Sequence, residues 1–143
     1  MSGGLIASVP STSVSTPSNP TGTASLTLVH AGLAIAFTPS KTGRVCIVIT
    51  GQFANSTATD GMEVNGRYGT GAAPANGAAV TGSGSGLATR GGTSDANNSL
   101  VPFNVVFWVT LTVGTAYWID AVFNAVTGGT ATLSQLSVSI TEF

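Results

Sequence analysis

The residues that could support nucleophilic catalysis centre on one histidine. His30 is the only histidine in the chain, and a serine nucleophile needs such a base beside it, held in place by a third group. Asp60, Asp95 or Asp120 could supply that group. However, the alternating Gly and Ser residues at 82–86 lead into no helix, unlike a nucleophile elbow. We therefore interpret His30 as a partly buried strand residue and expect no catalytic residues.

The carboxylates suggest a second chemistry, the hydrolysis of sugars by paired acids. Asp60 and Glu63 are close in sequence, but Asp60 precedes Gly61 and is more simply a turn former. Asp120 lies in an apolar segment, where an unpaired carboxylate is costly to bury. We predict that Asp120 is the acid of a structural ion pair, within the fold or across a subunit boundary. Its candidate partners are Arg44, Arg67 and Arg90.

The chain shows no pattern typical of a metal or cofactor site. It has one cysteine, no pair of histidines and no Asp-rich calcium loop. Its glycine-rich stretch lacks both the Lys-Ser/Thr ending and the following helix of a phosphate-binding loop. We predict neither a metal nor a cofactor. Cys46, within an apolar run, is interpreted as a small buried hydrophobe that forms no internal disulfide.

The composition excludes two classes of partner. Four Lys/Arg and five Asp/Glu give a formal net charge of −1 over 143 residues. Four scattered cations are too few to neutralise nucleic-acid phosphates, so we expect no nucleic-acid binding. No apolar run approaches the length of a membrane span, so we expect no membrane insertion. With 19 Gly, 16 Ser, 21 Thr and few charges, the surface favours association, which is typical of a protein within an assembly.

Three aromatic residues near the predicted C-terminal strands offer a last kind of site. They are Trp108, Tyr117 and Trp118. Aromatic rings can stack on sugars, so a glycan-facing surface is one interpretation of these residues. Packing in the core or at a subunit interface is the other.

Residues 1–23 differ in texture from the rest of the chain. Pro10, Pro17 and Pro20 lie among many Ser and Thr residues. Each proline removes a backbone donor and favours extended geometry in the residue before it. We predict an extended arm over 1–23, either flexible or ordered against a neighbour as an assembly contact. Residues 24–143 are predicted to form one folded domain.

Strand signals fill the predicted domain. Apolar residues alternate over 26–37, and the β-branched run at 45–49 is typical of a strand buried on both faces. Further strands are predicted at 62–68, 103–113, 116–126 and 131–140. The turns at Gly114 and at 127–130 indicate hairpins, because a Gly-Gly pair suits a two-residue hairpin turn. The pattern predicts an all-β fold, an antiparallel jelly roll or β-sandwich of about eight short strands.

Several motifs resemble those of small structural proteins encoded by phages and prophages. The resemblance is carried by 16–23 (TPSNPTGT), 67–77 (RYGTGAAPANG), 81–82 (TG), 101–103 (VPF), 114–120 (GTAYWID) and 127–131 (TGGTA). The β-rich pattern is also similar to trimeric jelly rolls of the tumour-necrosis-factor and complement-head type. Phages use such modules as capsid decoration (cement) proteins and as fibre or spike heads.

The resemblance implies a non-enzymatic virion structural protein that is made in the host cytoplasm. Our first hypothesis is a bacteriophage capsid decoration protein, a homotrimer that binds the major capsid protein of the assembled head and stabilises it. The alternative is a tail-fibre or spike head domain that binds a carbohydrate of the host surface through exposed aromatic residues.

Overall fold

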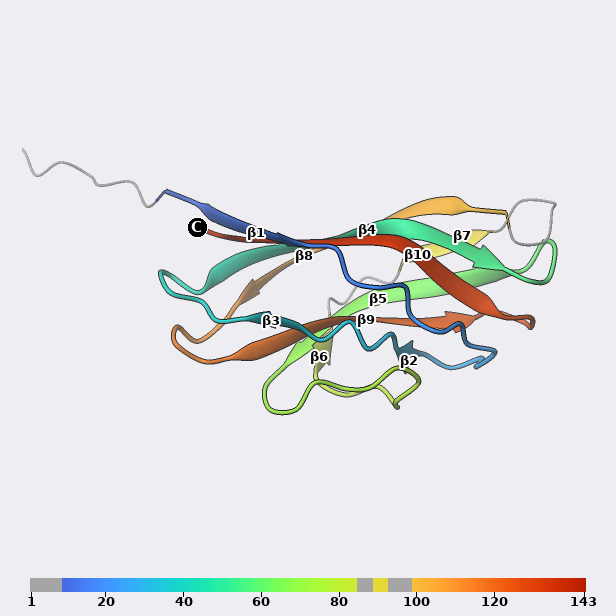
Figure 1. Ribbon diagram of the computed structural model, residues 1–143, viewed down its shortest axis with the longest axis horizontal. Helices are drawn as coiled ribbons and strands as arrows, with labels where there is room; N and C mark the ends of the chain where they lie inside the picture. The colour runs from blue at the N-terminus through green and yellow to red at the C-terminus, as the bar shows by residue number, and fades with distance from the viewer. Residues whose placement is uncertain (1–8, 85–88, 93–98) are drawn as a thin grey trace, which may run out of the picture.

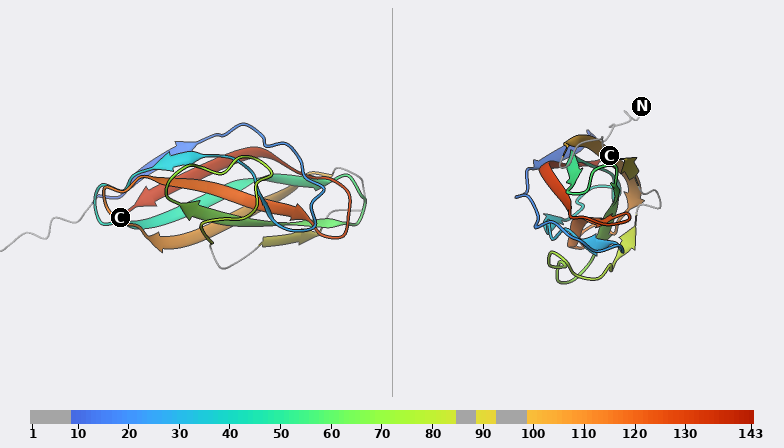
Figure 2. Two further views of the ribbon diagram at one scale, coloured as in Figure 1. Left: turned by 90° about the horizontal axis from the view of Figure 1, so that it is seen from below. Right: turned by 90° about the vertical axis from the view of Figure 1, so that its right-hand side faces the viewer.

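The computed structural model describes residues 9–84, 89–92 and 99–143. Within these ranges the regular structure is entirely β. The strands are β1 (Ser11–Ser15), β2 (Val29–His30), β3 (Ile35–Phe37), β4 (Arg44–Asn55), β5 (Gly61–Gly69), β6 (Ser83–Gly84), β7 (Thr89–Gly92), β8 (Val101–Thr110), β9 (Tyr117–Ala125) and β10 (Ala131–Glu142). Figures 1 and 2 show them as two layers that form an elongated sandwich.

The two layers are antiparallel sheets with a jelly-roll topology. Sheet A has the order β1-β10-β4-β8. Sheet B has the order β2-β9-β5-β6, with β3 also paired with β9 and β7 with β5. Since β2 and β3 share one partner and β6 and β7 share another, the strands occupy four positions in each sheet. This confirms the predicted all-β jelly roll or sandwich of about eight strands.

The hydrophobic core lies between the sheets. Along β4, Val45, Ile47 and Ile49 are fully buried and point inward. The alternate residues Cys46 and Val48 are half-buried and point outward. The prediction that 45–49 is buried on both faces is therefore wrong, and so is the interpretation of Cys46 as a buried residue. An unbroken apolar run does not reveal that one face of its sheet is left open.

Both predicted C-terminal turns exist, but neither closes a hairpin. Gly114 and Gly129 have φ angles of 80° and 73°, in the left-handed region that favours glycine. However, β8 and β10 belong to sheet A and β9 belongs to sheet B. Each turn therefore carries the chain from one sheet to the other. A turn signal marks a chain reversal, while the pairing of the next strand is decided by packing across the whole domain.

Part of the predicted arm belongs to sheet A. β1 lies at the edge of that sheet and pairs with β10. Figure 1 shows the segment after β1 passing from the level of sheet A toward sheet B. Along this path Thr23 pairs with Ala131, and the Asn19 side chain accepts a hydrogen bond from the backbone of Gln135. Pro10 is exposed, whereas Pro17 and Pro20 are half-buried.

Candidate functional site

The outer face of sheet B is covered by the chain itself. Trp118, Asp120 and Val122 point outward from β9, yet they are 6%, 0% and 0% exposed. The loop between β5 and β6, residues 70–82, lies over this region, and we call it the covering loop. Its backbone pairs with β2, because Gly77 N–H donates to the carbonyl of His30 and His30 N–H donates to that of Ala78.

Beneath the covering loop lies a buried network centred on His30. Its Nδ1 is 2.8 Å from Oδ2 of Asp120, and both side chains are 0% exposed. Its Nε2 is 3.0 Å from the backbone nitrogen of Thr81. An amide N–H can only donate, so Nε2 accepts and the ring proton resides on Nδ1. The imidazole is therefore neutral and bridges Asp120 to the covering loop.

The Asp120 carboxylate is saturated with hydrogen bonds. Besides His30, it accepts bonds from the backbone N–H groups of Gly32, Leu33 and Ala121, at 2.8–3.1 Å. A buried carboxylate needs this many donors to replace the water it loses. Asp120 thus fixes the segment between β2 and β3 against β9.

Of the three arginines considered for Asp120, the two whose side chains the structure describes form no ion pair with it. Arg67 is its cross-strand partner in the register of β5 and β9, but the Arg67 guanidinium packs over Gly84. Arg44 is exposed at the start of β4 in the other sheet. The side chain of Arg90 lies outside the described residues.

The geometry around His30 resembles a catalytic triad but lacks its chemistry. The hydroxyl of Thr81 is 3.3 Å from Nε2, so an acid, a histidine and a hydroxyl do follow one another. The single lone pair of Nε2, however, already accepts the Thr81 N–H at the shorter distance of 3.0 Å, so in this arrangement it does not accept the hydroxyl proton. Asp95, another acid considered for this role, lies outside the described residues.

Two further buried acids hold turns in place. Asp60 accepts bonds from the backbone of Gly61, Thr127 and Gly128, the latter at 2.7 Å. Desolvation raises the pKa of Asp60, but these hydrogen bonds outweigh it and hold the pKa below its ordinary value. Sequence analysis found the turn-forming role of Asp60 but not its bonds to the turn after β9.

Glu142 plays the same part at the other end of the sandwich. Its carboxylate accepts bonds from the backbone N–H groups of Ser40, Lys41 and Gly43 at 2.8–3.0 Å. Burial raises the pKa of Glu142, and these bonds lower it by more, so its pKa also lies below the ordinary value. Sequence analysis missed this residue, because the terminal acid of an alternating strand carries no signal of a distant turn.

The described part of the chain offers no metal centre and no membrane-spanning helix. Within residues 9–84, 89–92 and 99–143, no three His, Cys, Asp or Glu side chains gather closely enough to hold an ion. Among the same residues no helix is long and apolar enough to cross a bilayer.

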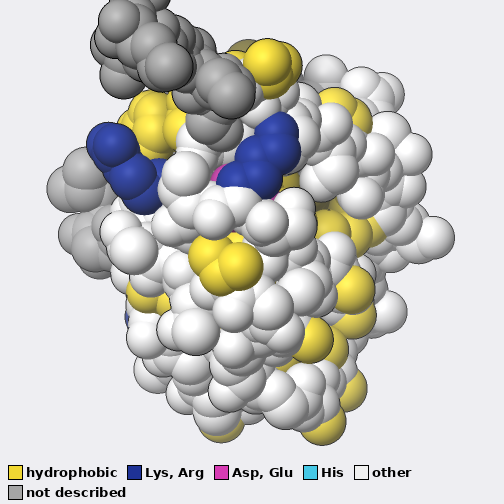
Figure 3. Space-filling model, turned by 90° about the vertical axis from the view of Figure 1, so that its left-hand side faces the viewer, with side chains coloured by type: hydrophobic (Ala, Val, Ile, Leu, Met, Phe, Trp, Pro, Cys, Tyr) yellow, Lys and Arg dark blue, Asp and Glu magenta, His cyan; other side chains and the backbone are white. Residues whose placement is uncertain are grey.

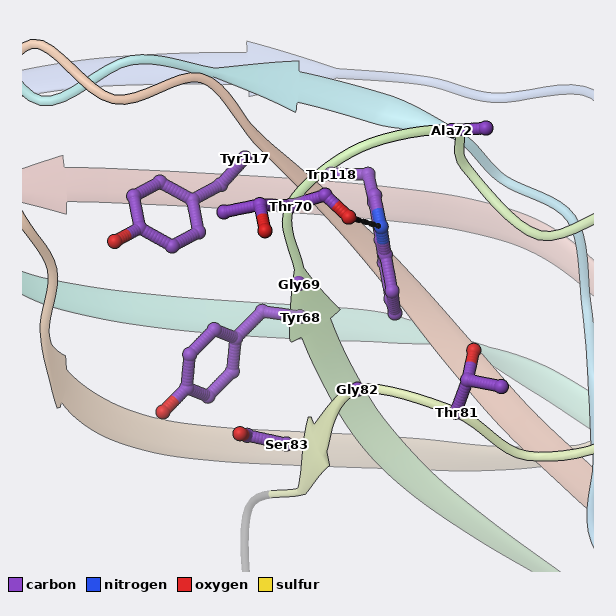
Figure 4. A pocket seen from close by; sticks show the side chains of 9 residues that line it. All are labelled: Tyr68, Gly69, Thr70, Ala72, Thr81, Gly82, Ser83, Tyr117 and Trp118. Atoms are coloured by element: carbon purple, nitrogen blue, oxygen red, sulfur yellow. Dashed lines mark hydrogen bonds between the residues drawn. The ribbon is translucent and has the colours of Figure 1, made fainter.

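The predicted aromatic residues separate into two places. Tyr117 and Trp118 line a hollow of about 410 Å³ together with Tyr68, and Figure 4 shows the two tyrosine rings side by side, with Trp118 on the far side of Thr70. The tyrosine ring centroids are 6.4 Å apart and tilted by 57°. Hydrogen bonds from the side chain and backbone of Thr112 hold the pKa of Tyr117 below its usual value.

Trp108 lies far from this hollow, on the outer face of sheet A. Its side chain is 63% exposed, and its ring centroid is 5.1 Å from that of Phe143. The neighbouring outward residues form what we call the open face. They are Thr12, Val14, Cys46, Val48, Thr50, Asn104, Val106, Trp108, Thr110, Ser137, Ser139 and Thr141. The alternation of Ser and Thr in β10 indicates a solvent-facing side in the sequence. β8 gives a weaker signal, because its outward side carries Val106 and Trp108 beside its polar residues.

Charged groups are sparse at the adjoining end of the sandwich. Figure 3 faces that end and shows basic side chains on a surface that is mostly uncharged. Two exposed cations lie here: Lys41, in the turn between β3 and β4, and Arg44, at the start of β4. Arg44, the cross-strand partner of Thr110, points outward at the edge of the open face, and the face carries no other charged side chain.

Comparison with known proteins gives a likeness of fold. No protein-family model and no curated protein matches the sequence. Among solved structures, a chain of infectious bursal disease virus strain Gx aligns with 92% of this chain at 14% identity and a TM-score of 0.51. The D431N mutant VP2 protein of that virus, from derived T=1 particles, aligns with 94% at 12% identity and a TM-score of 0.52. VP2 in a subviral particle aligns with 94% at 14% identity and a TM-score of 0.50.

The match is one-sided in length. This chain spans 32–33% of the length of those viral chains. At such low identity the comparison concerns the path of the backbone and transfers no residue roles. The chain therefore shares its β-sandwich fold, over nearly all of its length, with about a third of a protein found in virus particles.

Proposed function

We propose that this protein is a virion structural protein, and in particular a bacteriophage capsid decoration protein that binds the assembled head. The observation that carries the proposal is the fold likeness over 92–94% of the chain to proteins of infectious bursal disease virus particles. The low charge and the phage-like sequence motifs support it. Such a protein acts in the virion, and synthesis in the host cytoplasm is part of the same proposal.

The proposed mechanism is mechanical rather than catalytic. A homotrimer that contacts several copies of the major capsid protein binds the lattice and not the free subunits, so it stabilises the lattice by mass action. A face with a single charged side chain at its edge docks with little desolvation of ions. The occupied lone pair of His30 and the hydrogen-bonded carboxylates of Asp60, Asp120 and Glu142 favour a role without catalysis.

The N-terminal residues are proposed as the contact with the head. β1 begins at Ser11 and is part of sheet A, so the residues before it can be removed without loss of a strand. Val9 and Pro10, the first described residues, are exposed, the former at 75%. Within the predicted arm of 1–23, we therefore assign the assembly contact to residues 1–10.

Two experiments test the proposal. Gold-labelled antibodies against this protein should decorate the heads of the particles that carry it in electron micrographs. Deletion of residues 1–10, which spares β1, should leave the protein folded and abolish its sedimentation with heads. Full binding by the deletion variant would remove the arm from the mechanism, and the absence of label on any particle would overturn the proposed function.

A second candidate function is the head of a tail fibre or spike that binds a host carbohydrate. The observation that favours it is the hollow beside Tyr117, where two tyrosine rings lie next to the hydroxyls of Thr70 and Ser83. Rings and hydroxyls together suit sugar recognition. A glycan array would detect binding that Tyr117→Ala removes and Trp108→Ala, outside the hollow, retains. Labelling confined to the tail would favour this function over decoration.

A further inference from the structure

We propose that the open face of sheet A is the surface through which copies of this chain contact one another. This inference names the surface for the self-association proposed above, and it rests on that part of the proposed function and not on particle binding.

The first observation is the exposure of large apolar side chains at one place. Trp108 is 63% exposed, and Val106 and Val14 on the same face are 46% and 65% exposed. Phe143, 36% exposed, packs against Trp108 and enlarges the apolar area. Exposed tryptophan is uncommon on the free surface of a soluble monomer and is enriched among residues that dominate protein interfaces.

The second observation is that the outward tryptophan of sheet B, Trp118, is covered by the chain itself. Trp118 also points outward, but Gly69 and Gly82 allow the backbone to pack directly on its ring, and its Nε1 donates to the carbonyl of Thr70 at 3.2 Å. The chain therefore covers one outward tryptophan with its own loop. Trp108 packs against Phe143 yet stays 63% exposed, with no loop of the described chain over it, so a second molecule is free to bury it.

The third observation identifies the partner. Arg44 points outward at one edge of the open face, across from Thr110, and the other outward side chains of the face are uncharged. A face with one charge at its edge offers an acidic or basic partner little to recognise, and two copies can meet over its uncharged middle without like-charge repulsion. Hydroxyls of Ser and Thr can donate to and accept from identical groups, so the face is complementary to itself.

The extent of the face suits a small contact. The open-face residues span 46–50 in β4, 104–110 in β8, 137–141 in β10 and 12–14 in β1. At ~3.3 Å per residue and ~4.8 Å between strands, they cover roughly 300–350 Å² as a plane. Side-chain relief and the ring of Phe143 add to that area, which places the contact among the small interfaces that bury less than about 1,200 Å² in total.

The experiment compares the mass of the purified protein with that of two matched variants by light scattering after gel filtration. Trp108→Glu places a charge in the open face, whereas Leu26→Glu places one at a site that is 57% exposed and lies outside it. We expect the wild type and Leu26→Glu to have a multiple of the 14.1 kDa chain mass. Trp108→Glu should be monomeric, with an unchanged circular dichroism spectrum. If Trp108→Glu does not fold, Trp108→Ser takes its place.

The single cysteine gives a readout on the unmodified protein. Cys46 lies on the open face, directly across from Trp108 and Thr141 in the strand register. Its labelling by a maleimide should slow as the protein concentration rises, in proportion to the assembled fraction. A labelling rate that is independent of concentration would contradict the inference, as would a monomeric wild type at its solubility limit or equal masses for the two charged variants.

The outcomes separate this inference from particle binding. If the protein is monomeric but antibodies against it still decorate virus heads, the open-face contact is wrong and the decoration function stands. If the protein associates through Trp108 but the antibodies decorate no particle, the open-face contact stands and the decoration function is wrong.

Discussion

The outer faces of the two sheets differ in how the chain treats them. On sheet B, the segment around β2 and β3 and the covering loop bury Trp118, Asp120 and Val122 completely or nearly so. On sheet A, Trp108 and Val106 remain exposed between hydroxyl side chains. The covered face therefore contributes to the stability of the fold, whereas the open face is free for a partner.

The two outer faces differ because the long connection between β5 and β6 crosses sheet B and not sheet A. The connection between β5 and β6 returns over β9, and close contacts at Gly69 and Gly82 let it lie on Trp118. The connections between β3 and β4, between β8 and β9 and between β9 and β10 lie at the ends of the sandwich, so they leave the middle of sheet A bare. Substitutions on the two faces should therefore differ sharply in their effect on unfolding.

The largest effect is expected from Asp120→Ala on the covered face. The substitution leaves the His30 ring and the backbone N–H groups of Gly32 and Leu33 without their acceptor in a dry site. Each buried donor that loses its acceptor costs about 1–3 kcal/mol, so the three together should cost at least about 3 kcal/mol. Urea unfolding should show this loss in the free energy of unfolding. A loss below about 1 kcal/mol would mean that the covered face contributes little to the fold.

A smaller loss is expected from Gly82→Ala, which tests the contact of the covering loop with Trp118. An added Cβ would meet the Trp118 ring and the carbonyl of Tyr68, and Gly82 has a φ of 72°. Overpacking and backbone strain together should cost about 2–4 kcal/mol. Gly71→Ala is the matched control, since its φ is 82° but nothing lies within 4 Å. It should cost only about 1 kcal/mol, and equal melting temperatures for the two variants would contradict the packing argument.

The acids at the two ends of the sandwich predict a pH dependence that belongs to neither face. Asp60 and Glu142 have pKa values below their ordinary values in the folded protein. A carboxyl with a lowered folded pKa stabilises the fold above its unfolded pKa, and this contribution disappears as the pH falls through the folded pKa. Stability should therefore decrease from about pH 5 downward. Asp60→Asn and Glu142→Gln should each flatten that decrease, measured by urea unfolding between pH 7 and pH 3; an unchanged slope in both would contradict it.

Local patterns in the sequence were enough to predict the fold class. Alternation and turn residues gave strands at 62–68, 103–113, 116–126 and 131–140, all of which overlap observed strands. They could not give the partners of those strands. Gly114 and Gly129 mark reversals equally well in a hairpin and in a passage between sheets, so both predicted hairpins were wrong. The choice depends on which faces must be buried across the whole domain.

The candidate sites were less accessible to sequence reasoning. Asp120 stands out because an acid interrupts an apolar strand, and the need for a buried partner followed from that alone. That His30 is this partner depends on the pairing of β2 with β9 over 90 positions. The different fates of Trp108 and Trp118 are likewise absent from local sequence, because both lie in strands rich in apolar residues and only the covering loop distinguishes them.

The smallest effect on unfolding is expected from Trp108→Ser on the open face. Because the side chain is 63% exposed and its ring packs against that of Phe143 at the surface, its removal from an isolated molecule should change the free energy of unfolding by less than about 1 kcal/mol. The same substitution should matter more as the protein becomes concentrated. If copies associate through this face, the wild type gains stability with concentration, since association favours the folded state, whereas the variant does not. Melting temperatures measured over a dilution series test both statements at once. If the melting temperatures of wild type and variant run parallel as the concentration changes, Trp108 does not take part in association. If they converge on dilution and separate on concentration, stability belongs to the covered face and recognition to the open face.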